Sequence, residues 1–187
     1  MKFLVHDRRA RRVRARRRQG FTLIELAVAT SILMIGLVSV LSATSQMHSL
    51  RRSNRERTVA MNALRSMAER IHATSHEFSD DPTTWATDLL ATYGPNGTHG
   101  NRFQVEELDV AGSAPAVGTI EIVTSETSTD GQLRAELGMP RDLNADGDAA
   151  DEDVSASARI LPVLLTLRWR SERGERVIHH AFYVLGY

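Results

Sequence analysis

The sequence predicts an α+β protein in which one long N-terminal helix, membrane-spanning and then amphipathic, packs on a small antiparallel β-sheet head. An apolar run that starts at Phe21 passes without a helix breaker into a charged stretch with helical periodicity. Alternating, strand-like runs occur only in the later part of the chain. We therefore expect a basic segment at 1–20, a helix at 21–76 that spans a membrane over about 21–44, and a globular head at 77–187.

The neutral overall charge hides a strong asymmetry. Residues 1–20 hold nine basic residues and one acid, for a charge of +8, whereas the remaining 14 basic and 22 acidic residues give −8. There is no cysteine in the chain. A disulfide framework, a thiolate nucleophile and a cysteine-type zinc site are therefore excluded.

The apolar run is long enough to cross a bilayer. Between Phe21 and Met47 the only charged residue is Glu25. About 24 helical residues cover about 36 Å, against a hydrocarbon core of about 30 Å. The arginines before the run favour a cytoplasmic N-terminus, so the head is expected outside the cytoplasm.

Glu25 is the unusual residue of this run. A carboxylate inside an apolar membrane helix costs about 2.5–3.5 kcal/mol on insertion scales, and such a group is a functional candidate by default. A simple anchor gains nothing from it. An uncleaved anchor with a stray acid is nevertheless not excluded by hydropathy alone.

The segment Arg18-Gln-Gly-Phe-Thr-Leu-Ile-Glu-Leu26 closely resembles the processing site of type IV prepilins and type II secretion pseudopilins. The resemblance implies that a prepilin peptidase cuts between Gly20 and Phe21 and that Phe21 becomes N-methylated. It also implies that Glu25 is the assembly residue. The amine created at Phe21 is a plausible partner for Glu25 of an adjacent subunit, because pairing relieves the penalty on both charges.

The helical pattern continues beyond the membrane-spanning part as an amphipathic helix. Its apolar residues recur at intervals of three and four, which predicts one apolar stripe against the head. A methionine-containing stripe at this spacing is typical of a core. The residues expected in the stripe are Met47, Leu50, Met61, Leu64, Met67 and Ile71.

In the head, residues 83–93 predict a short capped helix ended by Gly94. The clearest hairpin is expected around Ser171–Gly174. Trp85, Trp169 and Tyr183 are expected in the core. The strand-like runs are Phe103–Leu108, Thr119–Thr124, Ile160–Arg170 and Arg176–Leu185.

The acidic segment Asp142–Asp153 has the spacing of an EF-hand-type calcium loop. Oxygen-bearing side chains occupy positions one, three and five, glycine position six, and a carboxylate position twelve. Position twelve is Asp rather than Glu, and no helix pair flanks the segment, so it looks more like the isolated loops of dockerins or of calcium-stabilised pseudopilin heads. The expected calcium ligands are the side chains of Asp142, Asn144, Asp146 and Asp153 and the carbonyl of Asp148.

A solvated Asp- and Gly-rich turn between two strands is the alternative interpretation of this loop. Calcium, if bound, would be a structural cofactor that replaces the missing disulfides. Six acids within twelve residues repel one another unless a cation or solvent intervenes.

No catalytic pattern stands out, and we expect no enzyme activity. His179 and His180 are adjacent on an expected strand, so their side chains point to opposite faces and cannot share a metal. Neither a phosphate-binding loop nor a nucleophile elbow occurs. The −8 charge after Gly20 argues against nucleic acid as a partner.

The resemblance implies a minor pilin or pseudopilin of a type IV pilus or type II secretion pseudopilus. Its expected partners are the prepilin peptidase, other pilin or pseudopilin subunits, an inner-membrane assembly platform and membrane lipid. The run Arg159–Trp169 also resembles minor pilins and pseudopilins. The alternative is an uncleaved, single-pass, calcium-binding surface or adhesion protein.

Overall fold

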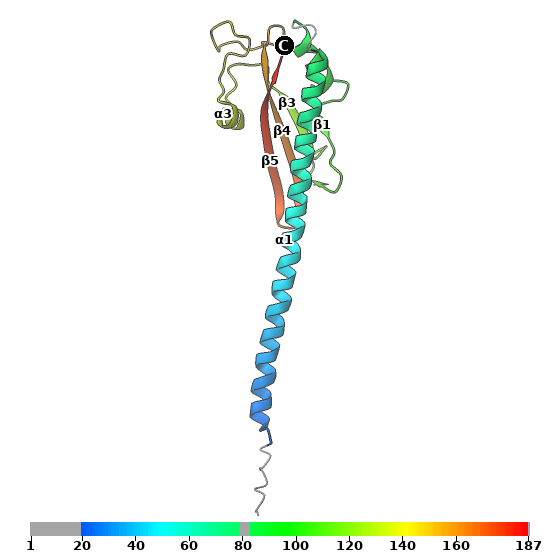
Figure 1. The fold of residues 1–187 in the computed structure, drawn as a ribbon, viewed down its shortest axis with the longest axis vertical. Coiled ribbons are helices and arrows are strands. Elements are labelled where there is room, and N and C mark those ends of the chain that lie inside the picture. Colours follow the sequence, from blue (N-terminus) through cyan, green and yellow to red (C-terminus); the bar gives the residue numbers. More distant parts are fainter. Residues whose placement is uncertain (1–19, 79–82, 187) are drawn as a thin grey trace, which may run out of the picture. The chain divides into compact units, whose positions relative to one another are not determined.

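The computed structural model describes residues 20–78 and 83–186. The basic segment up to residue 19 lies outside the described residues. The segment Asp80-Asp81-Pro82, which precedes the expected short helix, also lies outside them. The helices are α1 (Leu23–Phe78), α2 (Trp85–Tyr93) and α3 (Gly131–Leu137). The strands are β1 (Arg102–Phe103), β2 (Asp109–Val110), β3 (Gly118–Ile122), β4 (Ile160–Ser171) and β5 (Gly174–Leu185) (Figure 1). Two compact units meet between Gln46 and Met47.

The apolar side chains in the first part of α1 are exposed. Every residue from Gly20 to His48 is exposed, including Ile24 at 74% and Ile35 at 69%. By length and composition this helix is able to cross a membrane. Four of its hydroxyl groups bond inside the helix, since Thr30, Ser31, Ser39 and Thr44 each donate to a carbonyl three or four residues earlier. That satisfaction suits an apolar solvent, which offers no water to polar side chains.

The second part of α1 belongs to the head and buries a stripe of mostly small residues. The fully buried positions recur at intervals of three and four, as one helix face requires. They are Ala60, Leu64, Ala68, Ile71 and Ser75.

The methionine stripe is therefore correct only in part. Leu64 and Ile71 are buried and Met67 packs against the core, but Met61 remains 49% exposed. Met47 and Leu50 are exposed as well. The buried face passes through alanines that carry little hydrophobic signal in the sequence.

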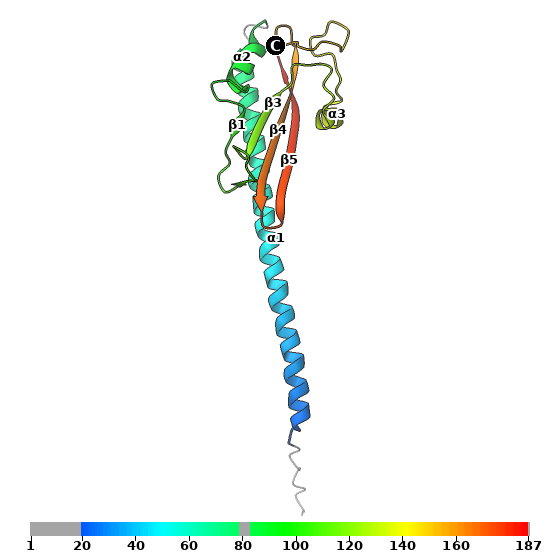
Figure 2. The same cartoon turned by 180° about the vertical axis from the view of Figure 1, so that it is seen from behind.

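Strand β4 is the centre of an antiparallel sheet (Figure 2). It pairs with β5 along its whole length and, on its other edge, with β3 and then with β2. The odd-numbered residues from Leu161 to Trp169 are all buried. Pro162 and Leu164 on the opposite face are buried too, whereas Arg168 and Arg170 are exposed. Thus β4 is covered on both faces at its start and on one face at its end.

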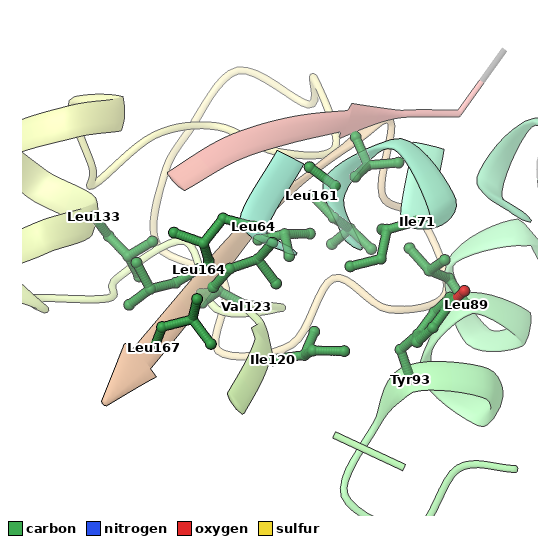
Figure 3. Close-up of a cluster of buried hydrophobic side chains, with 14 of the residues drawn as sticks. Leu64, Ile71, Leu89, Tyr93, Ile120, Val123, Leu133, Leu161, Leu164 and Leu167 are labelled. Atoms are coloured by element: carbon green, nitrogen blue, oxygen red, sulfur yellow. The ribbon is translucent and has the colours of Figure 1, made fainter. Parts of the chain in front are cut away.

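One hydrophobic core joins these elements. Figure 3 shows side chains of α1, α2, α3, β3 and β4 gathered in it, among them Leu64, Leu89, Leu133 and Leu161. The indole nitrogen of Trp85 donates to the carbonyl of Ala158 at 2.8 Å, and that of Trp169 donates to Glu56 at 3.3 Å. Both tryptophans are buried as expected, with their polar atoms satisfied.

A network of charged groups connects α1 to the end of the sheet. Burial of the Glu56 side chain would by itself raise its pKa. Hydrogen bonds from Ser171, Trp169 and Arg52 outweigh burial and lower the pKa of this carboxyl below its ordinary value. Arg52 also pairs with Glu172 in the β4–β5 turn at 2.7 Å. Glu56 is thus an ionised contact between helix and sheet.

Two expectations for the head are wrong. Only Phe103 of the run Phe103–Leu108 lies in a strand, because the N–H of Leu108 turns back to the carbonyl of Val105 and Glu107 adopts φ 70°. Arg55 of α1 pairs with Glu107 at 2.9 Å on this turn. Helix α2 forms, but Thr84 at its N-cap makes no capping hydrogen bond through its side chain.

The expected hairpin is confirmed and α3 was not expected. Gly174 takes φ 113° in the β4–β5 turn, a conformation open to glycine. Helix α3 starts at Asp130, whose side chain accepts from the N–H groups of Gln132 and Leu133, and it ends at Gly138 with φ 70°. Both capping residues are visible in the sequence. The helix is short and its apolar residues are few, so no periodic pattern in the sequence predicts it.

Candidate functional site

The residues predicted for processing lie at the exposed start of α1. Gly20, Phe21 and Thr22 precede the helix in non-helical conformation. No atom lies within 4 Å of the position that a Cβ would take at Gly20, and Phe21 is 88% exposed. The peptide between Gly20 and Phe21 is therefore accessible in this chain.

Thr22 and Glu25 form a reciprocal cap at the start of α1. The N–H of Leu26 donates to the carbonyl of Thr22 at 3.1 Å, which makes Thr22 the N-cap residue. The hydroxyl of Thr22 accepts from the N–H of Glu25 at 3.2 Å. The carboxylate of Glu25 accepts from the N–H of Thr22 at 3.1 Å and from its hydroxyl at 3.2 Å. This is a capping box of the type Thr-x-x-Glu.

The cap gives Glu25 a role inside its own chain that the sequence interpretation missed. The pattern of Thr22 and Glu25 three residues apart before an apolar run was the available signal. The pairing of Glu25 with Phe21 of another subunit is intermolecular and stays a prediction. The structure adds that the carboxylate of Glu25 contacts the N–H of Thr22, the residue next to Phe21, on which cleavage would create the amine.

The acidic loop is organised by its own backbone. The two carboxylate oxygens of Asp142 accept from the N–H groups of Ala145 and Gly147. Asn144 accepts from the N–H of Asp146 at 2.9 Å, and Asp146 accepts from that of Asp148 at 3.1 Å. These bonds are Asx turns, in which each side chain stabilises the backbone that follows it.

Asp151 contacts the predicted ligand Asn144, whereas Asp153, which the spacing predicts as a ligand, binds the backbone of Ser155. Asp153 accepts from the N–H of Ser155 at 3.0 Å, and this backbone hydrogen bond is the main cause that lowers its pKa. Asp151 accepts from the side chain of Asn144 at 2.9 Å. Burial, followed by repulsion from Asp146, Glu126 and Asp148, raises the pKa of Asp151.

Glu126 is a buried carboxylate that holds the loop from beneath. Its side chain is fully buried and accepts from the N–H of Leu143 at 2.6 Å and from that of Asp151 at 3.3 Å. The N–H of Glu126 in turn donates to the carbonyl of Asp151 at 3.0 Å. The residue thus ties together two backbone positions near the ends of the loop. Its sequence context, Ser125-Glu-Thr, gave no signal of burial.

The loop does not gather a metal site in the described part of the chain. There, no three His, Cys, Asp or Glu side chains converge so that they would hold a metal ion. The side chains of Asp142, Asn144 and Asp146 fold onto the loop backbone, and Asp153 faces Ser155. Calcium binding by Asp142, Asn144, Asp146, Asp148 and Asp153 stays a prediction.

We predict opposite effects for two substitutions in this loop. A raised pKa in the folded state means that ionised Asp151 costs stability above that pKa and that the cost disappears as the pH falls below it. Asp151→Asn should therefore raise the melting temperature at pH 7 in chelator, and the gain should vanish in acid. The lowered pKa of Asp153 means that its contribution is present at neutral pH and lost in acid, so Asp153→Asn should lower the melting temperature at pH 7.

The measurement is thermal unfolding of the full chain in detergent, followed by tryptophan fluorescence. The chain has two tryptophans, and both are buried in the head. A lower melting temperature for Asp151→Asn at pH 7 would contradict the repulsion inferred for this loop.

Residues 15–41 match the family model of the prokaryotic N-terminal methylation motif. The match contains Gly20, Phe21, Thr22 and Glu25, and it ends inside the exposed part of α1. No match was found among curated proteins or among solved structures. The methylation motif at the start of a long apolar helix, followed by an antiparallel sheet head, is consistent with a type IV pilin-like protein.

Proposed function

We propose that this chain is a structural subunit, a minor pilin or pseudopilin, of a type IV pilus or a type II secretion pseudopilus. A prepilin peptidase cleaves it after Gly20, Phe21 becomes N-methylated, and the exposed part of α1 then packs among other subunits. The observation that carries the proposal is the methylation motif at the start of a helix whose first part exposes its apolar side chains.

The charge pattern supports the expected orientation. The +8 segment that ends at Gly20 favours the cytoplasmic side, and the head follows on the periplasmic or extracellular side. Before assembly the subunit contacts membrane lipid and an inner-membrane assembly platform. Pilin-like proteins are generally structural rather than enzymatic, which agrees with the absence of a catalytic pattern in the sequence.

An uncleaved surface anchor is not favoured, because it does not explain the methylation motif. Placing an apolar helix in a bilayer requires no carboxylate, and the carboxylate opposes insertion.

The first experiment tests cleavage. The full chain is coexpressed with a prepilin peptidase and its intact mass is measured. We expect loss of residues 1–20 and a further methyl group on the new N-terminus. Gly20→Leu should abolish processing, whereas the matched Gly36→Leu should not, since Gly36 lies within α1 and likewise has no atom within 4 Å of its Cβ position. An unchanged wild-type mass would refute the proposal.

The second experiment tests the intermolecular role of Glu25. Glu25→Gln keeps an oxygen that accepts from Thr22 but removes the charge that would pair with the amine of a neighbouring Phe21. We expect cleavage to persist and incorporation into filaments to fall at least about tenfold, since removing one member of a buried charge pair leaves the other charge unpaired, which costs more than about 1.4 kcal/mol. Sheared filaments are quantified by immunoblot.

Ser31→Ala is the matched control for assembly. Its hydroxyl bonds only to the carbonyl of Ala27 in the same exposed part of α1, so filaments should form normally. Normal incorporation of Glu25→Gln would exclude the pairing role.

We also propose calcium binding by the loop 142–153. The ligand spacing supports it, as does the raised pKa of Asp151, because a cation in the loop would relieve the repulsion among its carboxylates.

The test compares melting temperatures in calcium and in chelator. Asp146→Ala should lower the melting temperature only when calcium is present, and Glu152→Ala, at a position of the loop that supplies no ligand by spacing, should behave like wild type. Equal melting of the wild-type chain in calcium and in chelator would eliminate the site.

A further inference from the structure

The capping box at the start of α1 determines which backbone groups near the cleavage point are free. In a helix that continued one turn further, the N–H of Glu25 would bond to the carbonyl of Phe21, and the N–H of Ile24 would bond to that of Gly20. Instead the hydroxyl of Thr22 takes the N–H of Glu25 at 3.2 Å. The first helical hydrogen bond runs from Leu26 to Thr22. The carbonyls of Gly20 and Phe21 are thereby left outside the helix.

The composition before this point does not stop a helix by itself. Arginine and glutamine are good helix formers, and they dominate the residues that precede Gly20. Gly20 disfavours a helix by only about 1 kcal/mol relative to alanine. The cap formed by Thr22 and Glu25 is the second feature that places the helix start at Leu23.

Hydrolysis of the Gly20–Phe21 peptide needs a free carbonyl. Water adds to the carbonyl carbon of Gly20, the bond to the nitrogen of Phe21 breaks, and that nitrogen takes up a proton. The products are a carboxylate on Gly20 and an α-amine on Phe21. Charge develops on the carbonyl oxygen of Gly20 during the addition, and a peptidase stabilises it with its own donors. An oxygen already bonded inside a helix is not available to them.

We propose that Thr22 is a positioning residue for cleavage, acting through the cap it forms with Glu25. The cap makes the helix begin at Leu23, two residues after the cleaved peptide, and keeps this peptide outside the helix and exposed. The inference rests on the proposed function, since it concerns the same cleavage. It assigns Thr22 a task before processing, separate from the later pairing of Glu25 in the filament.

The experiment measures the initial rate of cleavage of the full chain in membranes that contain a prepilin peptidase. Thr22→Val keeps the shape of the side chain but removes the hydroxyl, and Thr22→Ser keeps the hydroxyl. A cap is worth about 1 kcal/mol, which corresponds to about a fivefold change in the equilibrium constant between the capped and uncapped forms. We expect Thr22→Val to be cleaved up to about fivefold more slowly than wild type and Thr22→Ser to retain most of the rate.

Thr30→Val is the matched control. It makes the same chemical change eight residues later on the same exposed helix, where the hydroxyl donates to the carbonyls of Leu26 and Ala27 and caps nothing. It should be cleaved at the wild-type rate. Equal membrane insertion of all variants is checked by extraction with alkali.

A double-mutant cycle separates the cap from direct recognition of Thr22 by the peptidase. If both residues act through one cap, Thr22→Val combined with Glu25→Ala should be no slower than the slower single variant. Additive losses would overturn the inference, as would equal rates for Thr22→Val, Thr22→Ser and Thr30→Val. Failure of the wild-type chain to be cleaved would overturn the proposed function itself.

Discussion

The structure depends on one helix that meets two different surroundings along its length. The first part of α1 exposes its apolar side chains, and four of its hydroxyl groups are bonded to its own carbonyls. The second part buries a narrow stripe against the sheet through Ala60, Leu64 and Ala68. A surface of the first kind is stable only in lipid or against other apolar helices. The apolar surface of the first part of α1 therefore agrees with the proposed insertion into a membrane and packing among other subunits.

The parts of the fold that could be predicted from the sequence are those with a long periodic signal. The membrane-length run, the amphipathic continuation and the β4–β5 hairpin all repeat a pattern over ten residues or more. Helix α3 is only seven residues long and depends on its caps at Asp130 and Gly138. The run after Phe103 has strand-like residues, but it turns where the N–H of Leu108 bonds to the carbonyl of Val105 and Glu107 takes φ 70°.

The candidate sites also divide into residues with a local sequence signal and residues without one. Gly20, Phe21 and Glu25 follow from a linear motif, because the groups that matter are close in sequence. The partnership of Thr22 and Glu25 was equally local, but its meaning depends on where the helix begins. Glu126 was not predictable, because the amides it binds lie 17 and 25 residues further along the chain. Spacing within the acidic loop likewise did not show that Asp153 turns to Ser155 while Asp151 faces Asn144.

The buried carboxylate of Glu126 also bears on where the head is able to fold. It closes the loop with two hydrogen bonds from backbone N–H groups, in a chain without a cysteine. No thiol has to be oxidised and no wrong disulfide has to be rearranged, so folding needs neither a thiol oxidant nor a disulfide isomerase. The hydrogen bonds that close this loop therefore form independently of the redox state of the compartment in which the head folds.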